Sequence, residues 1–217
     1  RIFDVSPKHV SHFNREDPFN KLNKVEGWIC RKRNKNGGSM IITRVNDWTT
    51  KQVIWATPKL AYPYRDGTNE LQDFRGDIAG FYLGEKHNGM NILFYKYLDD
   101  KGETCITAKS KGTPFVGDSD VGSFLTLLRE AMDTTTDWTD SMEDFTNDST
   151  ATAISYELCG RKEPHLVKYD FDLALKPLFT IHENGRVKPI INTREKTRGY
   201  GNIHMTFGSS DDAEMKE

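Results

Sequence analysis

Two short segments of the chain carry a lysine that is followed two residues later by Asn or Glu and three residues later by a glycine. One is Glu85-Lys86-His87-Asn88-Gly89, and the other is Lys24-Val25-Glu26-Gly27. A lysine attacks an electrophile only after losing a proton, so it needs burial or nearby positive charge to lower its pKa. A glycine at this distance lets a bound phosphate come close to the backbone. Both segments therefore suit nucleophilic attack beside a phosphate.

The surroundings favour Lys86 over Lys24 as the nucleophile. Lys86 lies between two apolar, strand-like segments, and the basic segment Thr107-Ala108-Lys109-Ser110-Lys111-Gly112-Thr113-Pro114-Phe115 follows it. Lys24 instead follows a polar run, 14–23, and precedes a glycine-containing turn, 35–38. We therefore predict Lys86 as the nucleophile and keep Lys24 as the alternative.

The elements that would position these lysines are mostly strands. Short apolar runs separated by Gly, Asp and Asn turns predict strands at 53–56, 80–84, 91–98, 104–107 and 152–158, with a further apolar segment at 173–181. The turn 99–102 joins two of them into a β-hairpin. A helical stripe from Val121 to Met132, capped by 118–120, predicts one helix that ends before an acidic loop at 133–148. The sequence therefore predicts a mixed, mostly antiparallel α+β domain.

The composition is that of a compact protein with a well-charged surface, because 36% of the residues are apolar, 11% aromatic and 29% charged. The 30 Lys and Arg nearly balance the 32 Asp and Glu, giving a net charge of -2. Such a charge gives no overall attraction to a polyanion. Any nucleic-acid site must therefore be local, and the basic clusters at 31–35 and 109–111 are candidates.

The cysteines and the hydropathy bear on location. Cys30, Cys105 and Cys159 are widely spaced and form no CxxC pair, which argues against a disulfide framework and a zinc site. No stretch approaches about 18 apolar residues, and the first residues do not have the pattern of a signal peptide. We expect a cytoplasmic protein without a membrane partner.

Five segments resemble, in the same order, the conserved segments of the ATP-dependent RNA ligases, a family of covalent nucleotidyltransferases. The central one, Glu85-Lys86-His87-Asn88-Gly89, resembles their motif I in its Glu-Lys-x-Asn-Gly variety. The other four are similar to the Pro-Lys-Phe segment before motif I, the Lys-Thr-Arg-Gly-x-Pro-Phe segment after it, motif III (Phe-Glu-Leu-x-Gly) and motif IIIa (Phe-Asp-Ile), at 56–60, 109–115, 155–160 and 178–181. The resemblance covers about residues 53–190.

The resemblance implies a role for each matching residue. Lys86 would attack the α-phosphate of ATP and form lysyl-AMP, with Mg²⁺ or Mn²⁺ offsetting the phosphate charge. Glu157 would accept hydrogen bonds from the ribose or from the water shell of the metal, and Phe179 would stack on adenine. The implied ATP-binding residues are Glu85, Asn88, Gly89, Lys59, Lys109, Lys111, Glu157 and Phe179. Asn91 stands in the region where many family members place a phosphate- or ribose-binding arginine.

The fold implied by the resemblance is a nucleotidyltransferase (ATP-grasp-like) domain of two packed, mostly antiparallel sheets with flanking helices. It would occupy residues 51–217, after an N-terminal addition at 1–50. Motifs IV and V, which complete the family's set, have no clear counterpart after Ile181. The partner would be RNA with 5′-phosphate and 3′-hydroxyl ends. The alternatives are an mRNA-capping guanylyltransferase that uses GTP, and a non-catalytic RNA-binding homologue. The sequence does not indicate an oligomeric state.

Overall fold

The computed structural model describes residues 3, 5–32, 36–58, 86–117, 123–164 and 167–190, and the backbone of two short strands, 81–82 and 204–205. The chain divides into two compact units. The first comprises Arg1–Lys59 and His87–Ile190, and the second comprises Leu60–Lys86 and Ile191–Glu217. In the second unit, β5 (Phe81–Tyr82) pairs antiparallel with β11 (His204–Met205). All other elements belong to the first unit.

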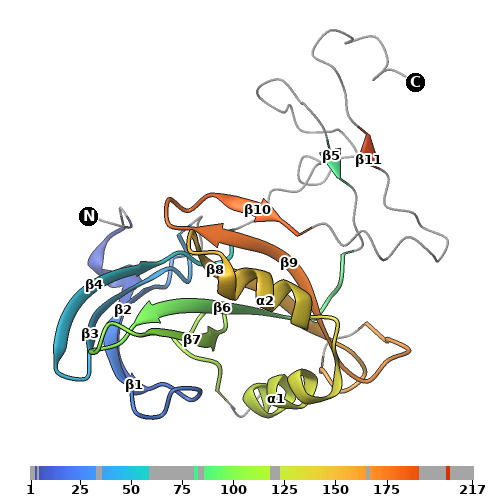
Figure 1. Ribbon diagram of the computed structural model, residues 1–217, viewed down its shortest axis with the longest axis horizontal. Helices are drawn as coiled ribbons and strands as arrows, with labels where there is room; N and C mark the ends of the chain where they lie inside the picture. Colours follow the sequence, from blue (N-terminus) through green and yellow to red (C-terminus); the bar gives the residue numbers. More distant parts are fainter. Residues whose placement is uncertain are drawn as a thin grey trace, which may run out of the picture. The chain divides into compact units, whose positions relative to one another are not determined.

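The N-terminal part of the first unit forms a four-stranded antiparallel sheet (Figure 1). A short 3₁₀ helix, η1 (Pro7–His9), precedes it. The strands lie in chain order: β1 (Val10–Glu16), β2 (Lys24–Cys30), β3 (Met40–Val45) and β4 (Trp48–Ile54). Side chains alternate across a strand, so Val25 and Ile29 of β2 point into the core, while Lys24 and Trp28 are exposed on the outer face.

A second, five-stranded antiparallel sheet has the order β10-β9-β8-β6-β7. Its strands are β6 (Met90–Leu98), β7 (Thr104–Lys109), β8 (Ala151–Cys159), β9 (Ala174–His182) and β10 (Val187–Pro189). The predicted hairpin is confirmed, since β6 and β7 pair across a turn in which Gly102 has φ 80°. Strands β6 and β8 lie next to each other near the centre of the sheet.

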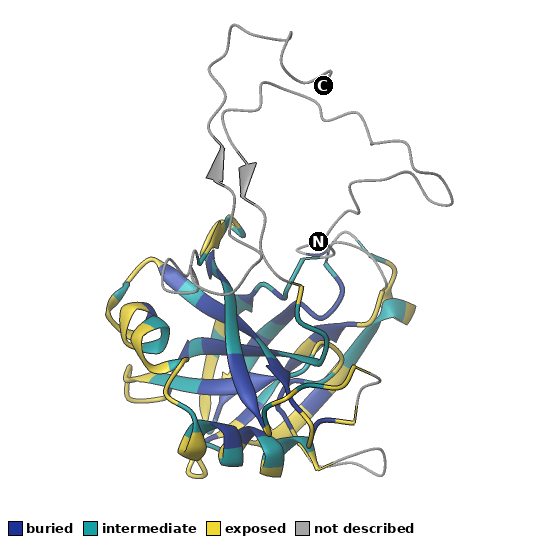
Figure 2. Cartoon of the chain, turned by 90° about the vertical axis from the view of Figure 1, so that its right-hand side faces the viewer, coloured by how far each residue is buried: buried dark blue, intermediate teal, exposed yellow. Residues whose placement is uncertain are grey.

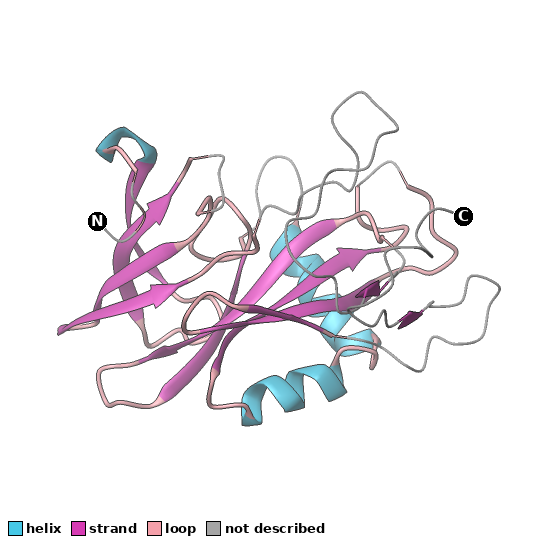
Figure 3. Cartoon of the chain, turned by 90° about the horizontal axis from the view of Figure 1, so that it is seen from above, coloured by secondary structure: helices cyan, strands magenta, loops and turns pink. Residues whose placement is uncertain are grey.

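Two helices in the described part cover one face of the five-stranded sheet (Figures 1 and 3). They are α1 (Phe124–Thr134) and α2 (Thr139–Asn147). The predicted helix agrees with α1, although its expected cap at 118–120 lies outside the described residues. The prediction of a loop at 133–148 is wrong, because α2 lies within it. Trp138, Met142 and Phe145 of this segment pack on the sheet at helical spacing, and Phe145 is buried.

The opposite face of the five-stranded sheet packs against the four-stranded sheet. Their common core contains Val25 and Ile42 from one sheet and Leu93, Tyr95 and Ile181 from the other. Figure 2 shows buried residues along the strands of both sheets. Residues 1–50, expected as an N-terminal addition, therefore supply most of one layer of the first unit, and the expected boundary at 50/51 falls inside β4.

The described residues of the first unit thus form a mixed α+β arrangement of two antiparallel sheets and two α-helices. Neither α1 nor α2, the α-helices in the described ranges, has the length and apolar character needed to span a bilayer.

Candidate functional site

The inner face of the five-stranded sheet changes from apolar to polar along β6 and β8. Tyr95 of β6, opposite Ala153 of β8, lies in the core between the sheets. At the other end of the same two strands, Asn91 is opposite Glu157. Residues opposite each other in an antiparallel pair point to the same face. The register therefore brings Asn91, two residues after Gly89, and Glu157 together beside the core.

A hydrogen bond joins the segments 85–89 and 155–160 directly. The Gly89 N–H donates to Glu157 Oε1 at 2.9 Å, across 68 residues of sequence. Gly89 has no room for a side chain, since an added Cβ would lie 2.1 Å from the carbonyl oxygen of Leu158. The motif glycine therefore allows β6 to begin in close contact with β8, and the amide fixes one oxygen of the carboxylate.

A polar cluster ties a third segment to the same place. The Thr57 hydroxyl donates to Asn91 Oδ1 at 2.7 Å, and Asn91 Nδ2 donates to Ser155 Oγ at 2.9 Å and to the Tyr156 carbonyl at 3.2 Å. Ser155 is fully buried. Asn91 thus uses both ends of its amide to hold the segment before motif I against the motif III strand. This contact is a structural role for Asn91.

The predicted nucleophile, Lys86, lies three residues before Gly89 in the chain. Its side chain is exposed, and it is the last residue of that part of the second unit. Two residues later, Asn88 belongs to the first unit, where its backbone N–H donates to the Tyr169 hydroxyl at 2.7 Å. Lys59 and Glu85, which the resemblance assigns to ATP binding, lie outside the described residues.

Lys109 is a buried cation at the end of β7. It pairs with Leu93, so it faces the inner side of the sheet, and only 1% of it is exposed. Its Nζ donates to the backbone carbonyls of Gly38 at 2.9 Å and Ser110 at 2.8 Å. Burial, together with the charges of Arg31 and Lys111, lowers the pKa of Lys109 to about 7. Arg31 and Lys111 thus place positive charge beside Lys109, whose own proton is lost near neutral pH.

Stability should depend on pH through Lys109. Its pKa is about 7 in the folded chain and near 10.5 in the unfolded chain. Between these values the unfolded chain holds the proton and the folded chain does not, so folding stability rises with pH, by up to about 1.4 kcal/mol per pH unit. Below pH 7 both states hold the proton and this contribution is flat.

Lys109→Met should remove that rise. Urea unfolding of both proteins at pH 6, 8 and 9.5 measures this effect. The free energy of unfolding of the native protein, relative to that of the variant, should increase from pH 6 to 8 and again from pH 8 to 9.5. The variant also loses two hydrogen bonds. Their loss lowers its free energy of unfolding by the same amount at every pH, so it does not change how that free energy varies with pH. Equal slopes for the two proteins would mean that Lys109 titrates normally.

Phe179, the predicted adenine platform, lies in the core between the two sheets. It is 6% exposed, and it pairs with Ser155 across β9 and β8, on the face that carries Glu157. Phe179 therefore lies on the inner face of the five-stranded sheet, next to the polar end that carries Glu157. Stacking on adenine stays a prediction for this residue.

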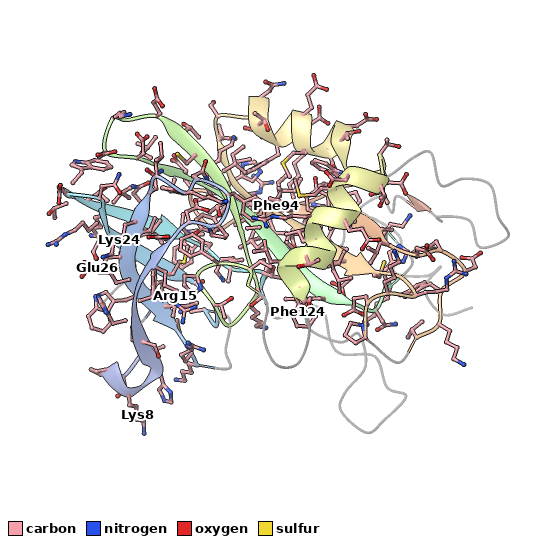
Figure 4. All side chains as sticks on the ribbon, turned by 90° about the horizontal axis from the view of Figure 1, so that it is seen from below. Lys8, Arg15, Lys24, Glu26, Phe94 and Phe124 are labelled. Atoms are coloured by element: carbon pink, nitrogen blue, oxygen red, sulfur yellow. The ribbon has the colours of Figure 1, made fainter. Side chains whose placement is uncertain are left out.

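Lys24, the alternative nucleophile, lies on the outer face of the four-stranded sheet. It is exposed at the start of β2, whereas its neighbour Val25 is fully buried in the core between the sheets. Figure 4 labels Lys24 and Glu26 on this strand. The residues of the candidate site lie on the inner face of the other sheet. Lys24 is therefore not on the face that carries Glu157 and Asn91, and Lys86 stays the predicted nucleophile.

The described residues hold no preformed closed metal site, because no three His, Cys, Asp or Glu side chains come together in them. A cavity of about 590 Å³ lies at the β9–β10 hairpin, lined by Thr150, His182, Glu183, Asn184, Arg186, Val187, Lys188 and Pro189. None of the described residues predicted for ATP binding lines it. The candidate site is therefore identified from the hydrogen bonds and charges of its residues, and neither from a closed metal site nor from this cavity.

Sequence reasoning missed two residues that take part in this arrangement. Tyr169 contacts Asn88 from outside all five segments, and Arg31 acts on Lys109 from the N-terminal half. The basic cluster at 31–35 was a signal for Arg31. Tyr169 had no comparable signal, because a lone tyrosine between charged residues has no distinctive pattern.

A comparison of the chain with protein-family models, curated proteins and solved structures finds no match.

Proposed function

We propose that this chain contains the adenylating core of an ATP-dependent RNA ligase, with a nucleotidyltransferase fold and Lys86 as the nucleophile. The observation that carries the proposal is the hydrogen bond from the Gly89 amide to Glu157. It links the segments that resemble motif I and motif III, as a shared nucleotide site would require. The cation group around Lys109 supports the proposal, because ATP brings negative charge that must be offset.

The proposed reaction begins with nucleophilic attack. The neutral amine of Lys86 attacks the α-phosphorus of ATP, a P–N bond forms, and the bond to the bridging oxygen breaks as pyrophosphate leaves. Lys111 would bind phosphate oxygens as a point charge. Lys109 would do so only after its Nζ leaves the carbonyls of Gly38 and Ser110. Asn88 and Gly89 would present the loop backbone to the nucleotide, and Lys59 and Glu85 keep their proposed contacts with the outgoing phosphates and the adenine.

Glu157 fits the part of a metal's outer ligand. Mg²⁺ in nucleotide sites usually keeps several waters and binds one or two carboxylates together with substrate phosphates. One oxygen of Glu157 accepts the Gly89 N–H, and the other is oriented by this bond. Mg²⁺ or Mn²⁺ would supply charge neutralisation at the phosphates. In such a site the phosphates of ATP and water would supply most of the metal's ligands, and Glu157 would be the carboxylate from the protein.

In the full proposal, AMP passes from Lys86 to the 5′-phosphate of an RNA, and a 3′-hydroxyl then displaces AMP to seal the strand. The expected cytoplasmic location belongs to the same proposal. Cys30 and Cys105 are free thiols, which is compatible with it.

Incubation with α-labelled ATP or GTP and Mg²⁺ tests the proposal. We expect label from ATP that survives denaturation and transfers to a 5′-phosphorylated RNA. Label from GTP alone would instead indicate a guanylyltransferase. RNA binding without any adduct would indicate a non-catalytic homologue and would refute the proposed reaction.

A further inference from the structure

The hydroxyl of Tyr169 holds both polar groups of a single backbone residue in the motif I loop. It accepts the N–H of Asn88 at 2.7 Å and donates to the carbonyl oxygen of Asn88 at 2.9 Å. Tyr169 is 81 residues away in sequence and is half-buried. A side chain that bonds both sides of one residue restrains the two peptide planes that flank it. Asn88 lies two residues after Lys86, so this restraint acts next to the predicted nucleophile.

The position of Tyr169 follows from the turn at Gly160. Gly160 ends the segment that resembles motif III and has φ 138°, and an added Cβ would lie 2.2 Å from the carbonyl oxygen of Asp172. Glycine is therefore required where the chain returns across this turn. Two backbone bonds close the turn, from Arg161 N to the Phe171 carbonyl at 3.0 Å and from Lys162 N to the Asp172 carbonyl at 3.2 Å.

The same turn supports the ring of Tyr169. Phe171 lies two residues further on, with its ring centroid 4.8 Å from that of Tyr169 and an interplanar angle of 35°. The backbone of Phe171 is fixed by Arg161, so the aromatic pair holds Tyr169 beside Asn88. The segment that resembles motif III would thus restrain the motif I loop at two points. Glu157 binds the Gly89 amide directly, and the turn at Gly160 places Tyr169 against Asn88.

We propose that Tyr169 is a positioning residue for the adenylation step, which acts by fixing the Asn88 backbone and with it the loop that carries Lys86. The inference rests on the proposed function. A phosphoryl transfer requires the attacking nitrogen in line with the leaving oxygen, and small misplacements of the attacking group are expensive in rate. Tyr169 touches neither the phosphate nor the reacting nitrogen in this role.

The test compares Tyr169→Phe with Tyr156→Phe. Tyr156 is a matched control, because its hydroxyl also has two partners, the Ser141 hydroxyl at 2.8 Å and the Trp138 carbonyl at 3.3 Å, but on the helix-covered face of the sheet. Each variant removes one oxygen and keeps the ring. Two readouts are measured on the full chain: the rate of lysyl-AMP formation at saturating and limiting ATP, and amide hydrogen exchange of Asn88.

We expect Tyr169→Phe to lower the maximal rate of adduct formation by roughly 10- to 100-fold, with the ATP concentration at half-maximal rate nearly unchanged. The amide of Asn88 should exchange roughly 10-fold faster because it loses its acceptor. Tyr156→Phe should leave both quantities within about 2-fold of the native protein. A merely structural role would move both variants alike.

Four results would overturn the inference. Unchanged exchange of the Asn88 amide in Tyr169→Phe would mean that the contact does not restrain the loop. Faster exchange with an unchanged rate would mean that the restraint does not serve adenylation. Equal losses in both variants would assign Tyr169 to general stability. Absence of an adduct in the native protein would refute the proposed function and this role together, while amide exchange would still decide whether the restraint exists.

Discussion

Gly89→Ala is expected to lower lysyl-AMP formation by more than roughly 100-fold and the free energy of unfolding by about 1–3 kcal/mol. The added Cβ would lie 2.1 Å from the carbonyl oxygen of Leu158 and 3.0 Å from the Cβ of Cys159. Backbone atoms cannot rotate out of the way as a flexible side chain can. Strands β6 and β8 must therefore separate at this point, and the bond from the Gly89 amide to Glu157 is lost.

Gly117→Ala is the matched control for this change. An added Cβ at Gly117 meets nothing within 4 Å, and Gly117 has no positive φ. Adduct formation and urea unfolding should be nearly native in this variant. If Gly89→Ala kept native rates of adduct formation, the close contact between the motif I and motif III segments would have no part in the reaction.

Asp17→Ala is expected to lower the free energy of unfolding by roughly 3–5 kcal/mol, the largest stability effect we predict. Asp17 is fully buried in the segment between β1 and β2. Its carboxylate accepts hydrogen bonds from the Tyr97 hydroxyl and the Thr107 hydroxyl, both at 2.7 Å, and from the Phe19 N–H and Asn20 Nδ2 at 2.9 and 2.8 Å.

Removing the carboxylate leaves the buried hydroxyls of Tyr97 and Thr107 without this acceptor, and each such loss costs about 1–3 kcal/mol. The segment between β1 and β2 also loses the bonds of this carboxylate to Tyr97 of β6 and Thr107 of β7. Asp100→Ala is the control, since Asp100 is exposed and accepts only a 3.2 Å hydrogen bond from Asn46 among the bonds described for it. It should change stability by less than about 0.5 kcal/mol. Similar urea midpoints for the two variants would contradict the structural role of Asp17.

The sequence predicted those elements whose own residues carry a strong local pattern. Strand β6 is rich in aromatic and branched residues, and a turn containing Gly102 follows it, so the hairpin could be recognised. Strand β1 could not, because Phe13 is its only fully buried side chain. Its strand conformation depends on pairing with β2, which a local pattern does not reveal. Helix α2 was hidden by its acidic residues, although Trp138, Met142 and Phe145 carry the helical spacing.

The site was predictable as a set of segments but not as a set of contacts. Glu157 and Gly89 were selected by resemblance, and the register of β6 with β8 then brings them together. The reason for glycine at position 89 is a backbone oxygen from a strand distant in sequence, which no local pattern contains. The contact of Tyr169 with Asn88 likewise depends on the return of the chain after Gly160.

The most direct test of the account is the covalent label left by α-labelled ATP on the native protein, on Lys86→Ala and on Lys24→Ala. We predict label on the native protein and on Lys24→Ala that survives denaturation, and its complete loss in Lys86→Ala, because no other group replaces the attacking amine. Circular dichroism on all three proteins confirms that they are folded. Label that persists in Lys86→Ala and disappears in Lys24→Ala would contradict the account.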